Sequence, residues 1–268
     1  MRNIGLLFTV FLGLTACKNE VKEITAETEI ITESPQENKL LTTYPAKVQT
    51  IFDAHGGVET WRKMNTLHFE IPKENGPEKH TVALGDRRSL IETNQWSIGY
   101  DGADVWLSQQ EEGAYKGNAH FYHNVMFYFY AMPFVIADEG ISYSPVEATI
   151  LDGKSYDGIK ISYNDGVGDT PKDEYIVYFD SDTNLMTWLA YTVTYGSNEK
   201  SNNWWYINYA EWTEINGLTL PKKMIWFEVK DGKPTVPRNS MDFENIKVSE
   251  SVLDTSLFVK PDGATISE

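Results

Sequence analysis

A repeated pattern of short alternating segments constrains the fold of this chain more than any other feature. Between residues 66 and 248, apolar and polar residues alternate in stretches such as 66–71 and 159–163. Turn-forming pairs such as Asp101-Gly102 and Asn216-Gly217 separate these stretches. Because successive side chains of a strand point to opposite faces, the pattern predicts strands that recur about every 12 residues and pair antiparallel.

The number of predicted strands limits the shape of the sheet. An antiparallel sheet of about ten strands must curl or close on itself. We therefore predict a mainly β fold, a single curled antiparallel sheet or half-barrel, preceded by an N-terminal helix. Residues 45–54 are the predicted helix, because three apolar residues share one face and Gly56-Gly57 follows. A short second helix is predicted over residues 58–64.

Residues 121–136 interrupt the alternation with a long apolar segment. Only His123 and Asn124 in it are strongly polar, so a helix here has no single solvent face. Pro133 ends or kinks such a helix near Met132. The segment is shorter than the roughly 20 residues that span a bilayer. We predict a helix that acts as a plug or lid against the concave face of the sheet; two buried strands are the alternative.

The start of the chain is typical of an export signal. A basic Arg2 precedes an apolar run over residues 4–14, and Leu14-Thr15-Ala16-Cys17 resembles the bacterial lipobox. This resemblance implies a signal peptide of residues 1–16, cleavage before Cys17 and acylation of Cys17. The alternative is an ordinary secreted protein with a free thiol. Acyl chains on Cys17 anchor a protein stably without a membrane-spanning segment.

An acidic tether is predicted between the anchor and the folded part. Residues 17–39 contain six glutamates against three lysines and show no lasting apolar period, so we expect disorder there. Residues 40–268 form the predicted β domain. The protein is then extracytoplasmic and lipid-anchored, in the outer membrane; the periplasmic leaflet and the cell surface both remain open.

Charge and residue counts exclude several functions. The formal net charge of −16 repels phosphate backbones, so we expect no nucleic-acid partner. The chain has one cysteine and no G-x-S-x-G motif, so we predict no catalytic residue and no enzyme. On a helix, His120 and His123 share a face and could hold a metal, but no pattern supplies a third ligand. We expect both imidazoles to bond to backbone or tyrosine hydroxyls, with no metal and no cofactor.

Two local motifs point to a known family. Tyr100-Asp101-Gly102, with Trp106 four residues later, resembles the "YDGxxxW" hairpin, and residues 253–261 resemble the closing "LDxxLFxxP" motif of the same domains. Together with an N-terminal helix and a long curled sheet, these motifs resemble the LolA/LolB-like lipoprotein-carrier half-barrel. His55-Gly56-Gly57 followed by Trp61 is similar to a family of uncharacterised Bacteroidetes lipoproteins.

The resemblance implies a binding or carrier protein. We predict a lipid-anchored protein that binds or transfers a hydrophobic ligand, a lipid or an acyl chain, in an apolar cavity; the sequence does not identify a partner protein. One alternative is a cell-surface module that binds glycan or protein through exposed aromatic residues, and a filled core without a cavity would favour it. An unrecognised hydrolase is the third. The predicted cavity residues are Phe121, Tyr122, Met126, Phe127, Phe129, Tyr130, Phe134 and Trp205.

Overall fold

A computed structural model describes residues 43–267 of the chain, apart from positions 165, 167, 169 and 198. The predicted signal peptide of residues 1–16, Cys17 and the tether of residues 17–39 lie outside the described residues. Within the described part of the chain, no helix combines the length and the apolar character that crossing a membrane requires.

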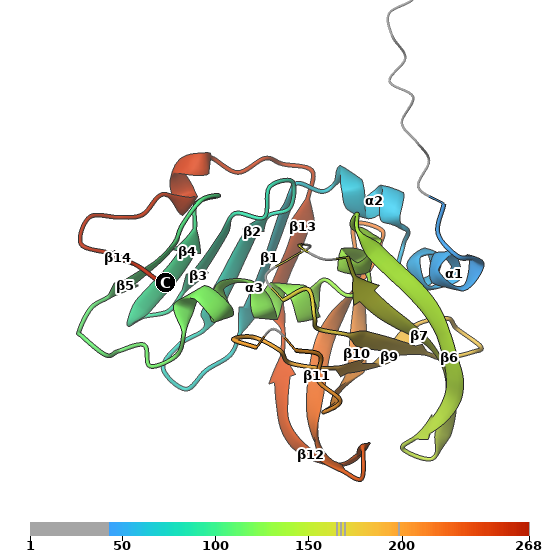
Figure 1. Ribbon diagram of the computed structural model, residues 1–268. Coiled ribbons are helices and arrows are strands. Elements are labelled where there is room, and N and C mark those ends of the chain that lie inside the picture. The colour runs from blue at the N-terminus through green and yellow to red at the C-terminus, as the bar shows by residue number, and fades with distance from the viewer. Residues whose placement is uncertain (1–42, 165, 167, 169, 198, 268) are drawn as a thin grey trace, which may run out of the picture. The chain divides into compact units, whose positions relative to one another are not determined.

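Alternating segments form two antiparallel seven-stranded sheets (Figure 1). The first sheet has the order β13-β1-β2-β3-β4-β5-β14 and the second the order β12-β11-β10-β9-β8-β7-β6. The strands of the first sheet are β1 (Thr66–Ile71), β2 (Glu78–Ala83), β3 (Ser89–Glu92), β4 (Trp96–Tyr100), β5 (Val105–Gln109), β13 (Glu244–Ser249) and β14 (Thr265–Ile266). The strands of the second sheet are β6 (Ile141–Leu151), β7 (Lys154–Tyr163), β8 (Tyr175–Phe179), β9 (Met186–Tyr191), β10 (Trp205–Ile215), β11 (Leu218–Lys230) and β12 (Lys233–Asp242).

The mainly antiparallel fold is confirmed, although the predicted single ladder is divided in two. The chain leaves the first sheet after β5 and enters the second at β6, and the helical segment between them separates the ladders. Phe243 alone separates β12 from β13, so one nearly continuous strand passes from the second sheet back to the first. The Phe243 N–H donates to the Lys222 carbonyl at 2.9 Å, and its ring is buried in the core. The two sheets are therefore parts of one curled surface.

Hairpin turns lie where the turn pairs predict them. Asn216 and Gly217, between β10 and β11, have φ angles of 52° and 78°. Asp231 and Gly232, between β11 and β12, have φ angles of 52° and 73°. Two successive residues in the left-handed region define the type I′ turn, whose twist matches that of the flanking strands. These turns fix the register of the long strands of the second sheet.

The two predicted N-terminal helices are present as α1 (Ala46–Ala54) and α2 (Val58–Lys63). Their apolar faces, which include Ile51 and Phe52 of α1, are buried in the main core. The turn between the helices packs on the β10–β11 hairpin, where the Thr219 N–H donates to the His55 carbonyl at 2.9 Å.

The apolar segment forms a helix, α3 (Ala119–Tyr130), rather than two strands. The Asn118 side chain caps its N-terminus by accepting a hydrogen bond from the Phe121 N–H at 2.9 Å. The helix is shorter than residues 121–136 because Pro133 cannot continue it, and a 3₁₀ turn, η1 (Phe134–Ala137), follows. In Figure 1, α3 lies between the two sheets, and both contribute to the core that buries it.

The two family motifs contact each other across the first sheet. Trp106 of the hairpin motif donates its indole N–H to the Phe258 carbonyl of the closing motif at 2.8 Å. Phe258 ends the 3₁₀ turn η2 (Thr255–Phe258), which the Asp254 carboxylate caps. Trp106 and Phe258 are buried with Leu90 in a small cluster of their own. Both motifs therefore hold the C-terminal segment on the first sheet.

Candidate functional site

A groove with a volume of about 270 Å³ opens between α3 and the second sheet. The helix contributes one face to it, formed by Phe121, Asn124, Val125 and Tyr128, together with the adjacent Phe129. Residues three and four apart on a helix are neighbours on its surface. The other face of α3 is buried in the core. One apolar face of the helix therefore packs in the core and another lines the groove, which accounts for a helix that is apolar on all sides.

The second sheet and its loops supply the opposite wall, which is rich in tyrosine. Tyr163 ends β7, Tyr175 begins β8 and Tyr191 ends β9, so the three rings meet at one end of the sheet. The ring centroids of Tyr128 and Tyr175 are 5.6 Å apart, and those of Tyr163 and Tyr175 are 6.0 Å apart. Seven of the described lining side chains are aromatic, which makes the groove suited to flat or flexible apolar groups.

The rim of the groove is also aromatic. Phe121 at the start of α3 lies against Tyr195 in the loop after β9, with a centroid distance of 4.8 Å. Both side chains are partly exposed, with 37% of each accessible to solvent. Deeper in the groove, the ring centroids of Phe129 and Tyr191 are 4.9 Å apart. Aromatic pairs therefore line the groove from its mouth to its floor.

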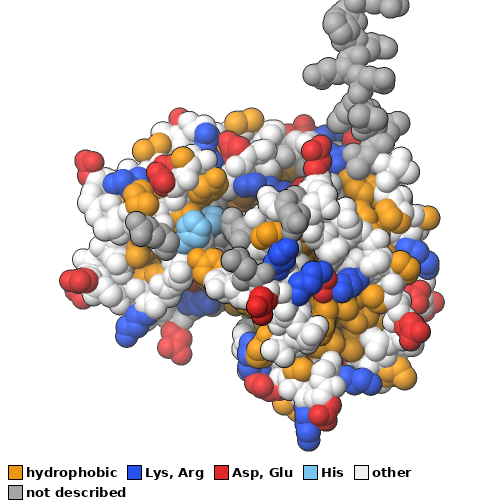
Figure 2. Space-filling model, viewed as in Figure 1, with side chains coloured by type: hydrophobic (Ala, Val, Ile, Leu, Met, Phe, Trp, Pro, Cys, Tyr) orange, Lys and Arg blue, Asp and Glu red, His pale blue; other side chains and the backbone are white. Residues whose placement is uncertain are grey.

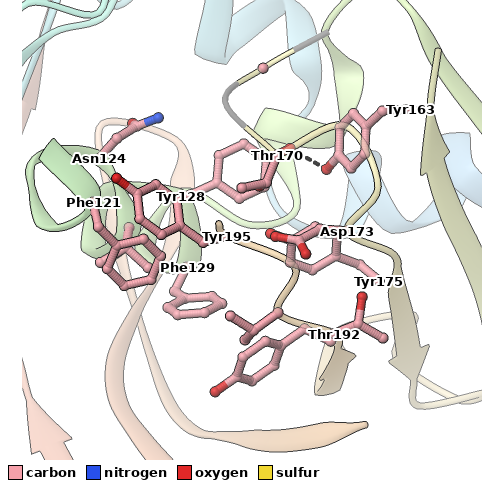
Figure 3. A pocket seen from close by; sticks show the side chains of 14 residues that line it. Phe121, Asn124, Tyr128, Phe129, Tyr163, Thr170, Asp173, Tyr175, Thr192 and Tyr195 are labelled. Atoms are coloured by element: carbon pink, nitrogen blue, oxygen red, sulfur yellow. Dashed lines mark hydrogen bonds between the residues drawn. The ribbon is translucent and has the colours of Figure 1, made fainter. Parts of the chain in front are cut away.

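One carboxylate, that of Asp173, lies among these rings (Figure 3). Asp173 is 7% exposed, and its Oδ1 accepts hydrogen bonds from the Thr194 N–H at 2.7 Å and the Thr194 hydroxyl at 2.8 Å. Asn124, Thr170 and Thr192 add uncharged polar groups to the lining. None of the described residues that line the groove is a lysine or an arginine.

The hydroxyls of Tyr128, Tyr163 and Tyr175 in the groove stay protonated at neutral pH. Burial, the largest cause, raises the pKa of Tyr128, Tyr163 and Tyr175 well above the ordinary value of tyrosine. The Tyr128 and Tyr163 hydroxyls also hydrogen-bond to each other. These groups can donate hydrogen bonds to a ligand, but their raised pKa values make them poor general bases or nucleophiles.

The structure places the eight predicted cavity residues in three environments. Phe121 and Phe129 line the groove. Trp205 is partly exposed on β10, with the Arg238 guanidinium 5.4 Å from its ring centroid, and does not line the groove. The others pack elsewhere: Tyr122 against the first sheet, and Met126, Phe127, Tyr130 and Phe134 in the core.

Sequence reasoning missed most of the groove's sheet-side residues, notably Tyr163, Asp173, Tyr175 and Tyr191. The alternation along the strands contains a signal for them, because Leu189, Tyr191, Val193 and Tyr195 occupy every second position and share one face. The alternation does not show which of the two sheet faces contacts α3, because that choice depends on tertiary packing.

The two helical histidines, His120 and His123, lie close together on α3. The His120 and His123 rings are 5.8 Å apart, and His123 Nδ1 lies 2.5 Å from the His120 carbonyl oxygen. Among the described residues, no group of three or more histidine, cysteine, aspartate or glutamate side chains is placed to hold a metal ion.

A buried polar network that sequence reasoning missed anchors α3 to β2. The Tyr122 hydroxyl donates to Glu78 Oε1 at 2.5 Å, and His80 Nε2 donates to the same oxygen at 2.8 Å. Burial raises the pKa of Glu78, but the hydrogen bonds from His80 and Tyr122 outweigh it, and the net pKa is lowered. Glu78 is therefore ionised at neutral pH and links α3 to β2 of the first sheet.

Comparison with known proteins identifies a family. The model of a family of unknown function, DUF6503, matches residues 89–237. No curated protein matches the chain. Similar solved structures include a LolA superfamily protein from Nitrosomonas europaea and a DUF1329 family protein from Desulfovibrio piger. Their sequence identities are 12% and 13% and their TM-scores 0.47 and 0.45; each match covers 80% of this chain and 97% of the other.

One of these similar structures thus belongs to the LolA superfamily, which the two sequence motifs also resemble. At these identities and TM-scores, the likeness says nothing about a ligand. The residues that line the groove determine which ligand it can bind.

Proposed function

The chain belongs to the DUF6503 family of unknown function, and we propose that it binds a small hydrophobic ligand in the groove beside α3. The groove itself supports this proposal. Seven of the described side chains that line it are aromatic. If protein atoms filled this space, these side chains would be buried in the core instead. A chain that acts only through surface aromatic residues needs no such cavity.

Hydrophobic burial supplies the binding energy in this account. Removing about 200 Å² of apolar ligand surface from water contributes roughly 5 kcal/mol before the costs of association. The hydroxyls of Tyr128 and Tyr163 and the amide of Asn124 orient the polar end of the ligand. No catalytic step is proposed: among the described lining residues, the polar groups are hydroxyls, an amide and one carboxylate, which Thr194 holds.

The proposed location follows from the lipobox-like sequence Leu14-Thr15-Ala16-Cys17. We propose that acylated Cys17 holds the protein on the extracytoplasmic side of the outer membrane, and that the acidic residues 17–39 separate the groove from the bilayer. The ligand is then a molecule present in that compartment.

Filling the groove should abolish binding of an apolar probe. Val125 lies on the groove face of α3 and is only partly buried, so Val125→Trp should place an indole in the cavity while the helix still folds. Binding of the fluorescent probe N-phenyl-1-naphthylamine should weaken by about tenfold or more, a loss of about 1.4 kcal/mol.

Val252→Trp is the matched control, because Val252 is 80% exposed and does not line the groove. This variant should bind the probe as the unmodified protein does. Equal binding by all three proteins would show that the probe lies elsewhere and would contradict the proposal.

A further inference from the structure

We propose that the groove selects cationic amphiphiles, ligands that join an apolar group to a positive charge, over fatty acids and other anionic lipids. This inference rests on the proposed function and names the chemical class of the ligand.

The first support is the unbalanced charge of Asp173. This side chain is more than nine-tenths buried, lines the groove and is fixed by two hydrogen bonds from Thr194. Among the ion pairs of the described residues, none includes Asp173. A partly desolvated carboxylate repels an anion more strongly than an exposed one does, because water screens less of its field. A carboxylate or phosphate ligand would meet this repulsion directly.

Two lysines, Lys160 and Lys200, pair with a different carboxylate, that of Glu174. Glu174 follows Asp173 and belongs to the opposite face, because it pairs with Lys160 of β7, whose neighbours Ile159 and Ile161 face the core. On that opposite face, Lys160 Nζ lies 2.8 Å and Lys200 Nζ 2.9 Å from the Glu174 oxygens. The alternation of the chain therefore places two ammonium groups with Glu174 and leaves the charge of Asp173 in the groove.

The aromatic lining is the second support. The face of an aromatic ring attracts a cation within about 6 Å of its centroid. The ring of Tyr128 on α3 and the rings of Tyr163 and Tyr175 on the second sheet form a cluster in the groove that Asp173 also lines. Carboxylate and ring faces together favour a positive group, such as a quaternary ammonium, that loses little hydration on entering. The formal charge of −16 adds a long-range attraction for cations.

The direct test compares three probes with the same ten-carbon chain: decyltrimethylammonium, 1-decanol and decanoate. Each is titrated below its micelle concentration into the full chain, with isothermal calorimetry as the measurement. The ammonium probe should bind about tenfold or more tighter than decanoate, with decanol between them. Decanoate binding as tightly as the ammonium probe would overturn the inference.

Asp173→Asn then assigns the preference to one carboxylate. Asparagine keeps an oxygen that accepts from Thr194 but carries no charge. Binding of the ammonium probe should weaken by about tenfold, while decanol binding stays within about twofold. Glu174→Gln is the matched control, since it removes an adjacent charge from the opposite face, and it should preserve the ratio between the probes.

The outcomes separate this inference from the proposed function. Decanol and decanoate binding without any preference for the ammonium probe would overturn the charge selection and leave hydrophobic binding intact. A preference that survives Asp173→Asn would also overturn it. If none of the three probes binds, both proposals fail.

Discussion

Gly56 and Gly57, in the turn between α1 and α2, differ in whether the second sheet leaves room for a Cβ atom. Both have φ angles in the left-handed region, 99° and 88°. A Cβ atom on Gly56 would lie 1.9 Å from the Gly217 carbonyl oxygen, whereas a Cβ on Gly57 would meet no atom within 4 Å. The backbone conformation favours glycine at both positions. Only at Gly56 does the contact with the Gly217 carbonyl oxygen also exclude a side chain.

The two glycines should therefore respond differently to alanine. Gly57→Ala should lower the free energy of unfolding by about 1–3 kcal/mol, the strain of an alanine at φ 88° and ψ 145°, which glycine adopts far more readily. Gly56→Ala should lower it by about 3 kcal/mol or more, because the β10–β11 turn must also move. Urea denaturation of both variants measures the difference. Equal losses would show that the α1–α2 turn does not pack on Gly217 as described.

At the scale of the element, α3 serves the core and the groove with different faces. Phe129 lines the groove and is 7% exposed, whereas Phe134 in η1 is fully buried and stacks on Trp61 with a centroid distance of 4.8 Å. The sequence shows both as members of one apolar segment. In the structure, Pro133 separates them into two short elements with different neighbours.

Alanine at these two positions should separate binding from stability. Phe134→Ala should cost about 3–5 kcal/mol of unfolding free energy and leave affinity for N-phenyl-1-naphthylamine unchanged. Phe129→Ala should enlarge the groove and admit a bulkier apolar probe that the unmodified protein excludes. Chemical denaturation and fluorescence titration measure the two effects. Unchanged binding of the bulkier probe by Phe129→Ala would show that Phe129 does not limit the groove.

Elements could be predicted from the sequence better than the groove could. Turn pairs such as Asn216-Gly217 require a left-handed backbone, and this local property locates hairpins wherever the rest of the chain lies. Pro133 likewise ends a helix by local geometry. The groove depends instead on which face of α3 meets which face of the second sheet. A helix that is apolar all round contains no signal for that choice, so Phe121 and Tyr122 look equivalent until the fold separates them.

The family motifs illustrate the same limit. Trp106 and Phe258 are far apart in sequence, and their hydrogen bond brings the two motifs together in space. Their role is to hold the C-terminal segment on the first sheet, away from the residues that line the groove. Motif resemblance therefore predicted the architecture, while the groove had to be found from the contacts between α3 and the second sheet.

At the scale of the whole molecule, two apolar surfaces are candidates for the ligand-binding site. One is the groove beside α3. The other lies on the surface of the second sheet, where Figure 2 shows hydrophobic side chains gathered. A distinct cluster with Trp188 and Tyr206 at its centre, and with Trp204 and Phe227 packed against it, belongs to this sheet and not to the main core. A surface interaction module would use such aromatic residues.

Photo-crosslinking distinguishes these two surfaces and tests the central claim directly. The full chain is irradiated with an alkyl amphiphile that carries a diazirine in its apolar part, and the labelled peptides are identified by mass spectrometry. Binding in the groove predicts label concentrated within residues 121–129 and 170–195, and its loss in Val125→Trp. Label confined to Trp204, Phe227 and their neighbours, with none on the groove face of α3, would contradict the account.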